Sequence, residues 1–310
     1  MNKCIQGRYL LRAGPTFNAR FVGVVAKAQE LSGVTIHGFV VLSTHWHCLA
    51  TYDDPNQMAL FHCHLGTNVS KEAGKLHSWP GSIFDRRYHH VELSDEVAVD
   101  RARLKYLFSQ GCKEGLVASP LDWPGPSSTW SLVSGEPLMG EWVDRTALTK
   151  ALEKGENVTG DDFIERLEVK LSPVRGMAHL SAKEYRREIL EIVREVEEET
   201  AAMHKAAGTE PLGAEWVLSQ DPHFRPSKAS EKRPRPWVHA IDPELRKEMK
   251  EALIFIAVAY RKAADRLKSG DRQAKFPMYT FPPGLPFVKA SSDSIRSLAP
   301  PSEVELLEPG

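Results

Sequence analysis

The stretch VTIHGFVVLSTHWHCLATY, from Val34 to Tyr52, decides the fold of this chain. Its first part, Val34 to Thr44, is rich in β-branched and aromatic residues, which predicts a buried strand. Its second part, His45 to Tyr52, predicts the partner of that strand in a hairpin. A β-sheet is therefore expected at the centre of the fold.

Helical and strand patterns alternate on both sides of this hairpin. The Asp53-Asp54-Pro55 triplet supplies a cap and a first-turn proline for the helix that follows the hairpin. The resulting order of strand, helix, strand, strand, helix, strand, helix is the ferredoxin-like α+β arrangement, in which helices cover one face of an antiparallel sheet and leave the other for a ligand. Besides the hairpin, the predicted elements are a first strand in the apolar stretch Cys4 to Leu11, helices Asn18 to Leu31 and Asn56 to Lys75, a strand Ser82 to Leu93, and a helix Ser94 to Gln110 ended by Gly111.

The composition changes from about Trp123, where glycine, proline and serine become frequent. We expect residues 1–130 to form one domain and residues 131–289 to form a mostly helical extension, with its clearest helices at Ser181 to Ala207 and Asp242 to Lys268. The proline-rich, basic segment 222–236 predicts an extended linker. Residues 290–310 predict a disordered acidic tail.

Bulk composition excludes several classes of protein. The net charge of −1 argues against attraction to nucleic acid over the whole surface, so a DNA-binding surface must be a local patch. No window approaches the roughly 18 consecutive apolar residues that cross a bilayer. The four cysteines form no CxxC pair and are interpreted as free thiols in a reducing cytosol.

Histidines point to the place where chemistry is expected, because eight of the twelve lie in the first 90 residues. In a strand, side chains two residues apart point to the same face, so His45 and His47 can present two imidazoles to one metal ion, with Trp46 turned the other way. In the later helix, Tyr106 and Gln110 are four residues apart and share a face. A phenol is a poor nucleophile at neutral pH unless its proton is taken or a cation favours the phenolate.

Three motifs carry a resemblance to a known family. The chain is similar to the REP-associated tyrosine transposases, which belong to the single-tyrosine HUH nucleases, closely over about residues 5–130 and more loosely up to FPPGLPFV at Phe281 to Val288. Thr44 departs from the asparagine that commonly precedes the first histidine. The motifs are GFVVLSTHWH from Gly38 to His47, IFDRRYHHV from Ile83 to Val91, and LKYLFSQGCKEGLVASPLDWPG from Leu104 to Gly125.

The resemblance implies a ferredoxin-like HUH domain that cuts and rejoins single-stranded, hairpin-bearing DNA through a 5′-phosphotyrosine. Tyr106 falls at the nucleophile, and His45, His47 and Gln110 fall at the ligands of Mg²⁺ or Mn²⁺. The location implied is the bacterial cytoplasm, in association with the nucleoid, with no membrane partner. Whether the protein is a monomer or a homodimer stays open. The candidates for contacts with phosphates and unpaired bases are Arg86, Arg87, Tyr88 and His89; the alternative for these four is a polar strand rim.

Two other interpretations remain at this point. The first is a zinc site drawn from His45, His47, Cys48, His62, Cys63 and His64, whose residue types zinc favours. Its weakness is that His62 and His64 lie in a predicted helix, where residues two apart diverge by about 200°. The second is a domesticated or decayed protein that binds DNA hairpins without cutting them.

Overall fold

The structure is a computed structural model, and it describes residues 1–226, 237–278 and 280–283. Most of the predicted linker, residues 227–236, and the predicted tail, residues 290–310, lie outside the described residues. The described part of the linker, residues 222–226, has a turn and no helix or strand. The chain divides between Arg235 and Pro236 into two compact units, which are described separately.

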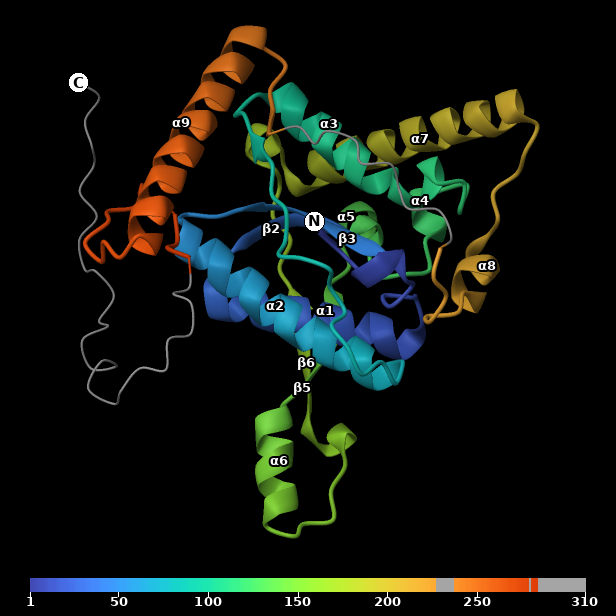
Figure 1. Ribbon diagram of the computed structural model, residues 1–310. Helices are drawn as coiled ribbons and strands as arrows, with labels where there is room; N and C mark the ends of the chain where they lie inside the picture. The colour runs from blue at the N-terminus through green and yellow to red at the C-terminus, as the bar shows by residue number, and fades with distance from the viewer. Residues whose placement is uncertain (227–236, 279, 284–310) are drawn as a thin grey trace. The chain divides into compact units, whose positions relative to one another are not determined.

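A three-stranded antiparallel sheet forms the centre of the first unit (Figure 1). Its strands are β1 (Asn2–Lys3), β2 (Thr35–Leu42) and β3 (His45–Thr51), in the order β1-β3-β2. Strands β2 and β3 form the predicted hairpin, which is thereby confirmed. Its register pairs Leu42 with His45 and Val40 with His47.

Two helices pack on one face of this sheet, and both were predicted. They are α1 (Pro15–Ser32) and α2 (Pro55–Leu76). Asp54 caps α2 by accepting hydrogen bonds from the backbone N–H groups of Asn56 and Gln57, which satisfies donors that a helix start leaves unpaired. The cluster that they bury includes Phe17, Phe21, Val25, Ile36, Phe39, Val41, Trp46, Phe61, Leu65 and Val69.

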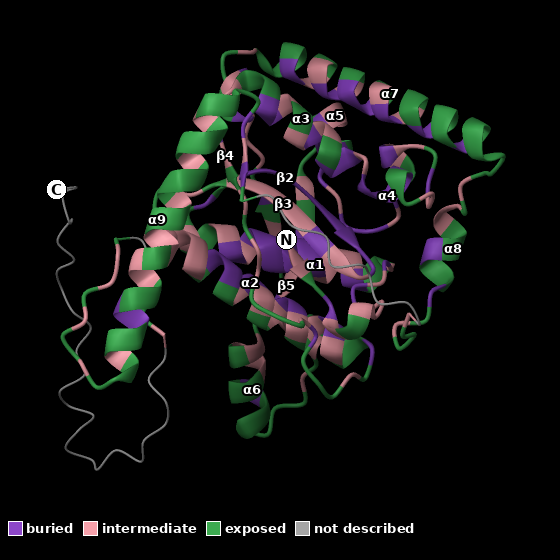
Figure 2. Ribbon diagram, turned by 45° about the horizontal axis from the view of Figure 1, so that its top comes forward, coloured by how far each residue is buried: buried purple, intermediate pink, exposed green. Residues whose placement is uncertain are grey.

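The second face of the sheet is also covered, so the expectation that helices leave it available is wrong. It is covered by α3 (Val97–Phe108) and α5 (Thr129–Ser134), and α7 (Ala182–Ala207) packs on these two helices. The reason is visible in β2, where every residue after the first is buried (Figure 2), so both of its faces need apolar neighbours. The second cluster joins Val40 and Leu42 to Leu104, Leu107, Phe108, Ile189, Ile192, Val193 and Val196.

The strand predicted from Ser82 to Leu93 is wrong over most of its length. Only β4 (Glu92–Leu93) is a strand, and Phe84 forms an isolated bridge with Cys4. The segment nevertheless runs beside the chain start, because Asp85 N–H donates to Lys3 and His89 N–H donates to Met1. These contacts are too widely spaced for a regular ladder.

The first strand and the third helix also differ from prediction. The strand predicted from Cys4 to Leu11 is wrong, because β1 precedes this stretch, Cys4 forms only an isolated bridge, and a 3₁₀ turn follows at Ile5–Gly7. The helix predicted from Ser94 to Gln110 stops at Phe108, and the short α4 (Gln110–Lys113) follows. Ser109 and Gln110 both donate to the carbonyl of Tyr106, which satisfies an acceptor that the helix end leaves open.

The part of the first unit beyond residue 130 is not only helical. It contains an antiparallel hairpin of β5 (Leu138–Val143) and β6 (Ile164–Val169), with α6 (Arg145–Glu153) between them. This hairpin reaches α1 at a glycine contact, where a Cβ on Gly23 would lie 2.2 Å from the backbone of Glu141. Alternation over only six residues per strand made it hard to predict. This part also contains α8 (Ala214–Ser219) and 3₁₀ helices at Gly160–Phe163 and Arg175–Met177, and a further 3₁₀ helix lies before it at Pro120–Asp122.

Helix α7 confirms the helix predicted from Ser181 to Ala207. Ser181 and Glu184 form a capping box at its start, and Gly208 ends it in the left-handed conformation with φ 62°. One side of α7 is buried and the other is exposed (Figure 2). The boundary predicted near residue 130 stays a prediction, although α7 packs on α3 across it.

The second unit contains β7 (Val238–His239) and α9 (Pro243–Lys268), which confirms the last predicted helix. Asp242 caps α9, and residues after the helix return to it. The hydroxyl of Tyr260 donates to the carbonyl of Phe281, and its ring lies 5.3 Å from the ring of Phe276.

The protein is therefore α+β with small antiparallel sheets. The finer assignment to the ferredoxin-like HUH fold stays a prediction. Among the described helices, none combines the length and apolar character needed to cross a membrane.

Candidate active site

Strand β3 holds the two histidines side by side. Trp46 points into the α1/α2 cluster, so His45 and His47 point to the opposite face, towards α3. The centroids of the two imidazole rings are 4.9 Å apart, with planes at 74°. The alternation predicted from the sequence thus places both rings together on one face.

Helix α3 brings Tyr106 to the same place. The centroid of its ring lies 5.7 Å from that of His47, in an edge-on arrangement. Leu107 and Phe108 on this helix are buried in the second cluster, whereas the side chain of Tyr106 is 41% exposed. Tyr106 is therefore both next to the histidine pair and open to a ligand.

Gln110 is buried, and its side chain is hydrogen-bonded to the backbone of Tyr106. It is 1% exposed, and its amide nitrogen donates to the Tyr106 carbonyl at 2.6 Å. A carbonyl oxygen only accepts, so this bond fixes which end of the amide is nitrogen. The amide oxygen is the atom that remains for a ligand, and the role of Gln110 as a metal ligand stays a prediction.

The histidine pair is held neutral at physiological pH. Burial, together with the smaller effect of the Lys3 charge, lowers the pKa of His45 to about 4. Burial and the neighbouring His45 lower the pKa of His47 to about 2. Neutral imidazole is the form that has a lone pair to give to a metal ion.

Thr44 contacts the first histidine directly. Its hydroxyl oxygen lies 2.8 Å from Nδ1 of His45. If Nδ1–H donates to this hydroxyl, Nε2 keeps its lone pair, which is the arrangement usual for metal-bound histidine. Thr44, which stands where the similar transposases commonly have asparagine, can thus orient the imidazole of His45.

Two cations next to Tyr106 were missed in the sequence. The guanidinium of Arg103 lies 5.2 Å from the centroid of the Tyr106 ring, and Nζ of Lys113 lies 4.0 Å from it. Lys113 also lowers the pKa of both histidines. Spacings of three and seven residues from Tyr106 place such residues on one helical face, and that signal was available.

The four predicted DNA contacts lie at the edge of the sheet beside β1. Arg86 and Arg87 are exposed, and Arg86 pairs with Asp85 at 3.4 Å. Tyr88 is half-buried and stacks on His62, with ring centroids 3.8 Å apart. One face of that ring is therefore used inside the protein. His89 holds the chain start, because the amino group of Met1 donates to its carbonyl at 2.9 Å.

The residues considered for a zinc site do not converge. Cys48 and His62 lie with the α1/α2 cluster, on the face opposite to His45 and His47. His64 packs on Trp142, with ring centroids 5.3 Å apart. Within residues 1–226, 237–278 and 280–283, no three side chains of histidine, cysteine, aspartate or glutamate form a metal-binding group. The four cysteines are free.

Comparison with known proteins adds no assignment to this geometry. No family model matches the chain, and neither a curated protein nor a solved structure matches it. The functional interpretation therefore rests on the motifs and on the arrangement of His45, His47 and Tyr106.

Proposed function

We propose that the protein is a single-tyrosine HUH nuclease and strand transferase that acts on single-stranded, hairpin-bearing DNA. The observation that carries this proposal is the meeting of Tyr106 with the His45–His47 pair on one face of the sheet. The three residues come from β3 and α3, which are separated by α2 and the segment that follows it. An edge-on contact between the half-exposed Tyr106 and His47, which itself lies beside His45, suits metal-assisted attack on a phosphate.

The donor set fits a divalent ion in part. Two neutral imidazoles supply nitrogen ligands, and the Gln110 amide oxygen is the further ligand that the proposal assigns. A bound Mg²⁺ or Mn²⁺ would polarise the scissile phosphate and screen its charge. Because Mn²⁺, as a transition-metal ion, accepts imidazole nitrogen more readily than Mg²⁺ does, we expect Mn²⁺ to be the more effective of the two ions.

The protein's own residues account for the rest of the reaction. The Tyr106 hydroxyl oxygen attacks phosphorus, the bond from phosphorus to the 3′ oxygen breaks, and a 5′-phosphotyrosine forms. The phenol proton passes to solvent, to which Tyr106 is open, and the leaving 3′ oxygen takes up a proton. The ester retains the energy of the broken linkage, so a DNA 3′-hydroxyl can reverse the step without ATP.

The proposal extends to partner and location. Arg86 and Arg87 are exposed and can reach phosphates, whereas the stacked Tyr88 has one ring face engaged. A DNA substrate would associate the protein with the nucleoid in a bacterial cytoplasm.

The test is covalent capture of DNA. Labelled single-stranded hairpin oligonucleotides from the flanks of the protein's own gene are incubated with Mg²⁺ or Mn²⁺ and examined for an adduct that resists SDS. We expect an adduct with the wild type and none with Tyr106→Phe, which lacks only the hydroxyl. Tyr9→Phe, outside the site, is the matched control and should keep the adduct.

The alternative function, hairpin binding without cleavage, predicts a different pattern. Binding would be equal in the wild type and in Tyr106→Phe, and no divalent ion would produce an adduct. That result with folded protein would replace the nuclease by the binder.

A further inference from the structure

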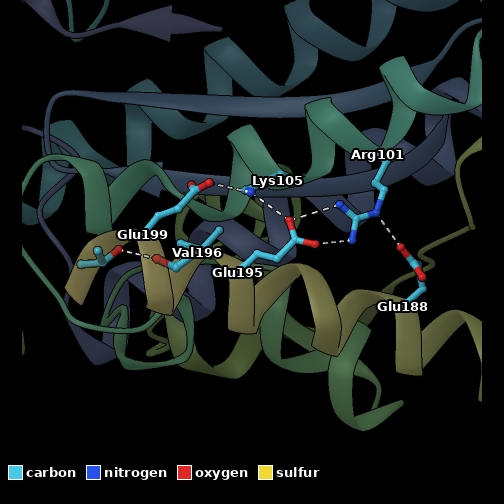
Figure 3. A network of polar contacts seen from close by, with 7 residues as sticks. Arg101, Lys105, Glu188, Glu195, Val196 and Glu199 are labelled. Atoms are coloured by element: carbon cyan, nitrogen blue, oxygen red, sulfur yellow. Dashed lines mark hydrogen bonds and ion pairs between the residues drawn. The ribbon is translucent and has the colours of Figure 1, made fainter. Parts of the chain in front are cut away.

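The cations of α3, which carries Tyr106, and of α4, which follows it, lie in two different environments. Arg101 and Lys105 face α7, where they meet three glutamates (Figure 3). Arg101 bonds Glu188 and Glu195 at 2.6 Å each, and Lys105 bonds Glu195 at 2.8 Å. These pairs raise the pKa of Arg101 and lower that of Glu195 to about 2. Their charges are therefore neutralised within the protein.

Lys113 is in a different position. It lies on α4, its Nζ is 4.0 Å from the centroid of the Tyr106 ring, and its side chain is exposed. In the part of the chain that the structure describes, no carboxylate forms an ion pair with it. Tyr106 in turn contacts His47, with ring centroids 5.7 Å apart. One ammonium thus lies over the tyrosine that adjoins the histidine pair.

We propose that Lys113 binds the phosphate that Tyr106 attacks, so that the Tyr106–Lys113 pair is an anion site of the DNA backbone that works without a metal ion. This inference rests on the proposed function for the attack itself. The site's ligand is a phosphodiester of single-stranded DNA, recognised as a charge and not by base. An ammonium is a compact point charge with three donors, which suits a phosphate oxygen.

The alternative is that Lys113 contacts the Tyr106 ring only as part of the packing of the protein and binds no DNA. A cation over an exposed ring contributes on the order of 0.5–1 kcal/mol, so this role predicts a small change in stability and none in DNA affinity. The two roles therefore differ in what a charge-removing substitution does to binding.

The experiment measures binding of a fluorescent oligodeoxythymidine to the full chain by anisotropy, in EDTA, over a range of salt concentrations. We expect Lys113→Met to weaken binding several-fold and to reduce the slope of log K against log salt by about 0.7, the value for one phosphate contact on a single strand. Lys113→Arg keeps the positive charge and should therefore retain both the wild-type affinity and the wild-type slope. Lys105→Met removes an equal charge from the same region, but that charge is already paired, so it should leave the slope unchanged.

Equal slopes for wild type and Lys113→Met, or equal losses in Lys113→Met and Lys105→Met, would overturn the proposal. Melting curves establish that each variant is folded. Because the assay needs neither metal nor cleavage, a loss specific to Lys113 supports the anion site even if no adduct ever forms. An adduct formed equally well by Lys113→Met would contradict the proposal while leaving the nuclease intact.

Discussion

The two faces of the central sheet differ in the residues that β3 contributes to them. On the α1/α2 face, Trp46 is 1% exposed and lies 6.2 Å from Phe21 and 5.7 Å from His62, measured between ring centroids. On the α3 face, its neighbours His45 and His47 lie at the margin of the second cluster, beside a half-exposed tyrosine. Alternation along β3 therefore separates the residues that stabilise the fold from those that are available for chemistry.

The histidines on the two faces also have different surroundings. His62, on the α1/α2 face, is enclosed between Tyr88, Trp46 and Phe61, and its Nε2 lies 3.1 Å from the hydroxyl of Tyr52. His47 has a ring contact with His45 and with Tyr106. A histidine with a depressed pKa is thus a packed core residue on one face and a candidate ligand on the other.

The largest expected effect is that of Trp46→Ala on the α1/α2 face. Removing a fully buried indole leaves a cavity in the first cluster, so we expect the free energy of unfolding to fall by about 3–5 kcal/mol. Urea denaturation followed by circular dichroism measures this change. A loss below about 1 kcal/mol would show that this face does not carry the stability assigned to it.

We expect low pH to decrease the stability of the fold through protonation of His62. The direction of this effect follows from the lowered pKa of its imidazole. Burial lowers this pKa from 6.5 to about 3 in the folded protein, so the unfolded state binds the proton first. Between these values stability should decrease as pH falls, by about 1.4 kcal/mol per pH unit for this one group. His62→Gln should reduce the slope of unfolding free energy against pH by that amount. An unchanged slope from pH 6 to pH 4 would contradict the assignment.

A smaller effect is expected where α7 meets α3. Glu195→Gln removes the carboxylate that bonds both Arg101 and Lys105, and these groups are partly exposed. We expect a loss of roughly 1 kcal/mol or less, which decreases further at high salt because ions screen such pairs. Glu191→Gln, one turn earlier and exposed, is the matched control. Unfolding at two salt concentrations separates the ion pairs from other effects.

The smallest effect on stability is expected for His47→Ala. We expect a change within about 1 kcal/mol, since the ring has contacts with His45 and Tyr106 but no hydrogen bond among those described. The same variant should lose the SDS-resistant adduct, whereas His64→Ala, on α2, should keep it. A destabilisation equal to that of Trp46→Ala would remove the distinction between the two faces.

Much of the architecture could be predicted from local sequence. Asp54 and Asp242 cap α2 and α9, and Ser181 with Glu184 starts α7, because their side chains bond the first backbone N–H groups whatever surrounds them. The hairpin was predicted from the β-branched and aromatic residues of Val34 to Thr44 and from the strand-like run that follows them. The segment from Ser82 to Leu93 was not predictable in this way, because its pairing depends on where residues 1–5 lie.

The candidate site was likewise predictable from the sequence only in part. By itself the sequence determined that His45 and His47 share a face, since strand geometry has a period of two, and that a helix carries Tyr106. Only the tertiary structure decided that this helix packs over that face, that Lys113 lies above the ring of Tyr106, and that Arg101 and Lys105 are held by glutamates. The physical reason is range: caps and alternation depend on neighbours in the chain, whereas packing of α3 against β3 and α7 depends on apolar surfaces far apart in it.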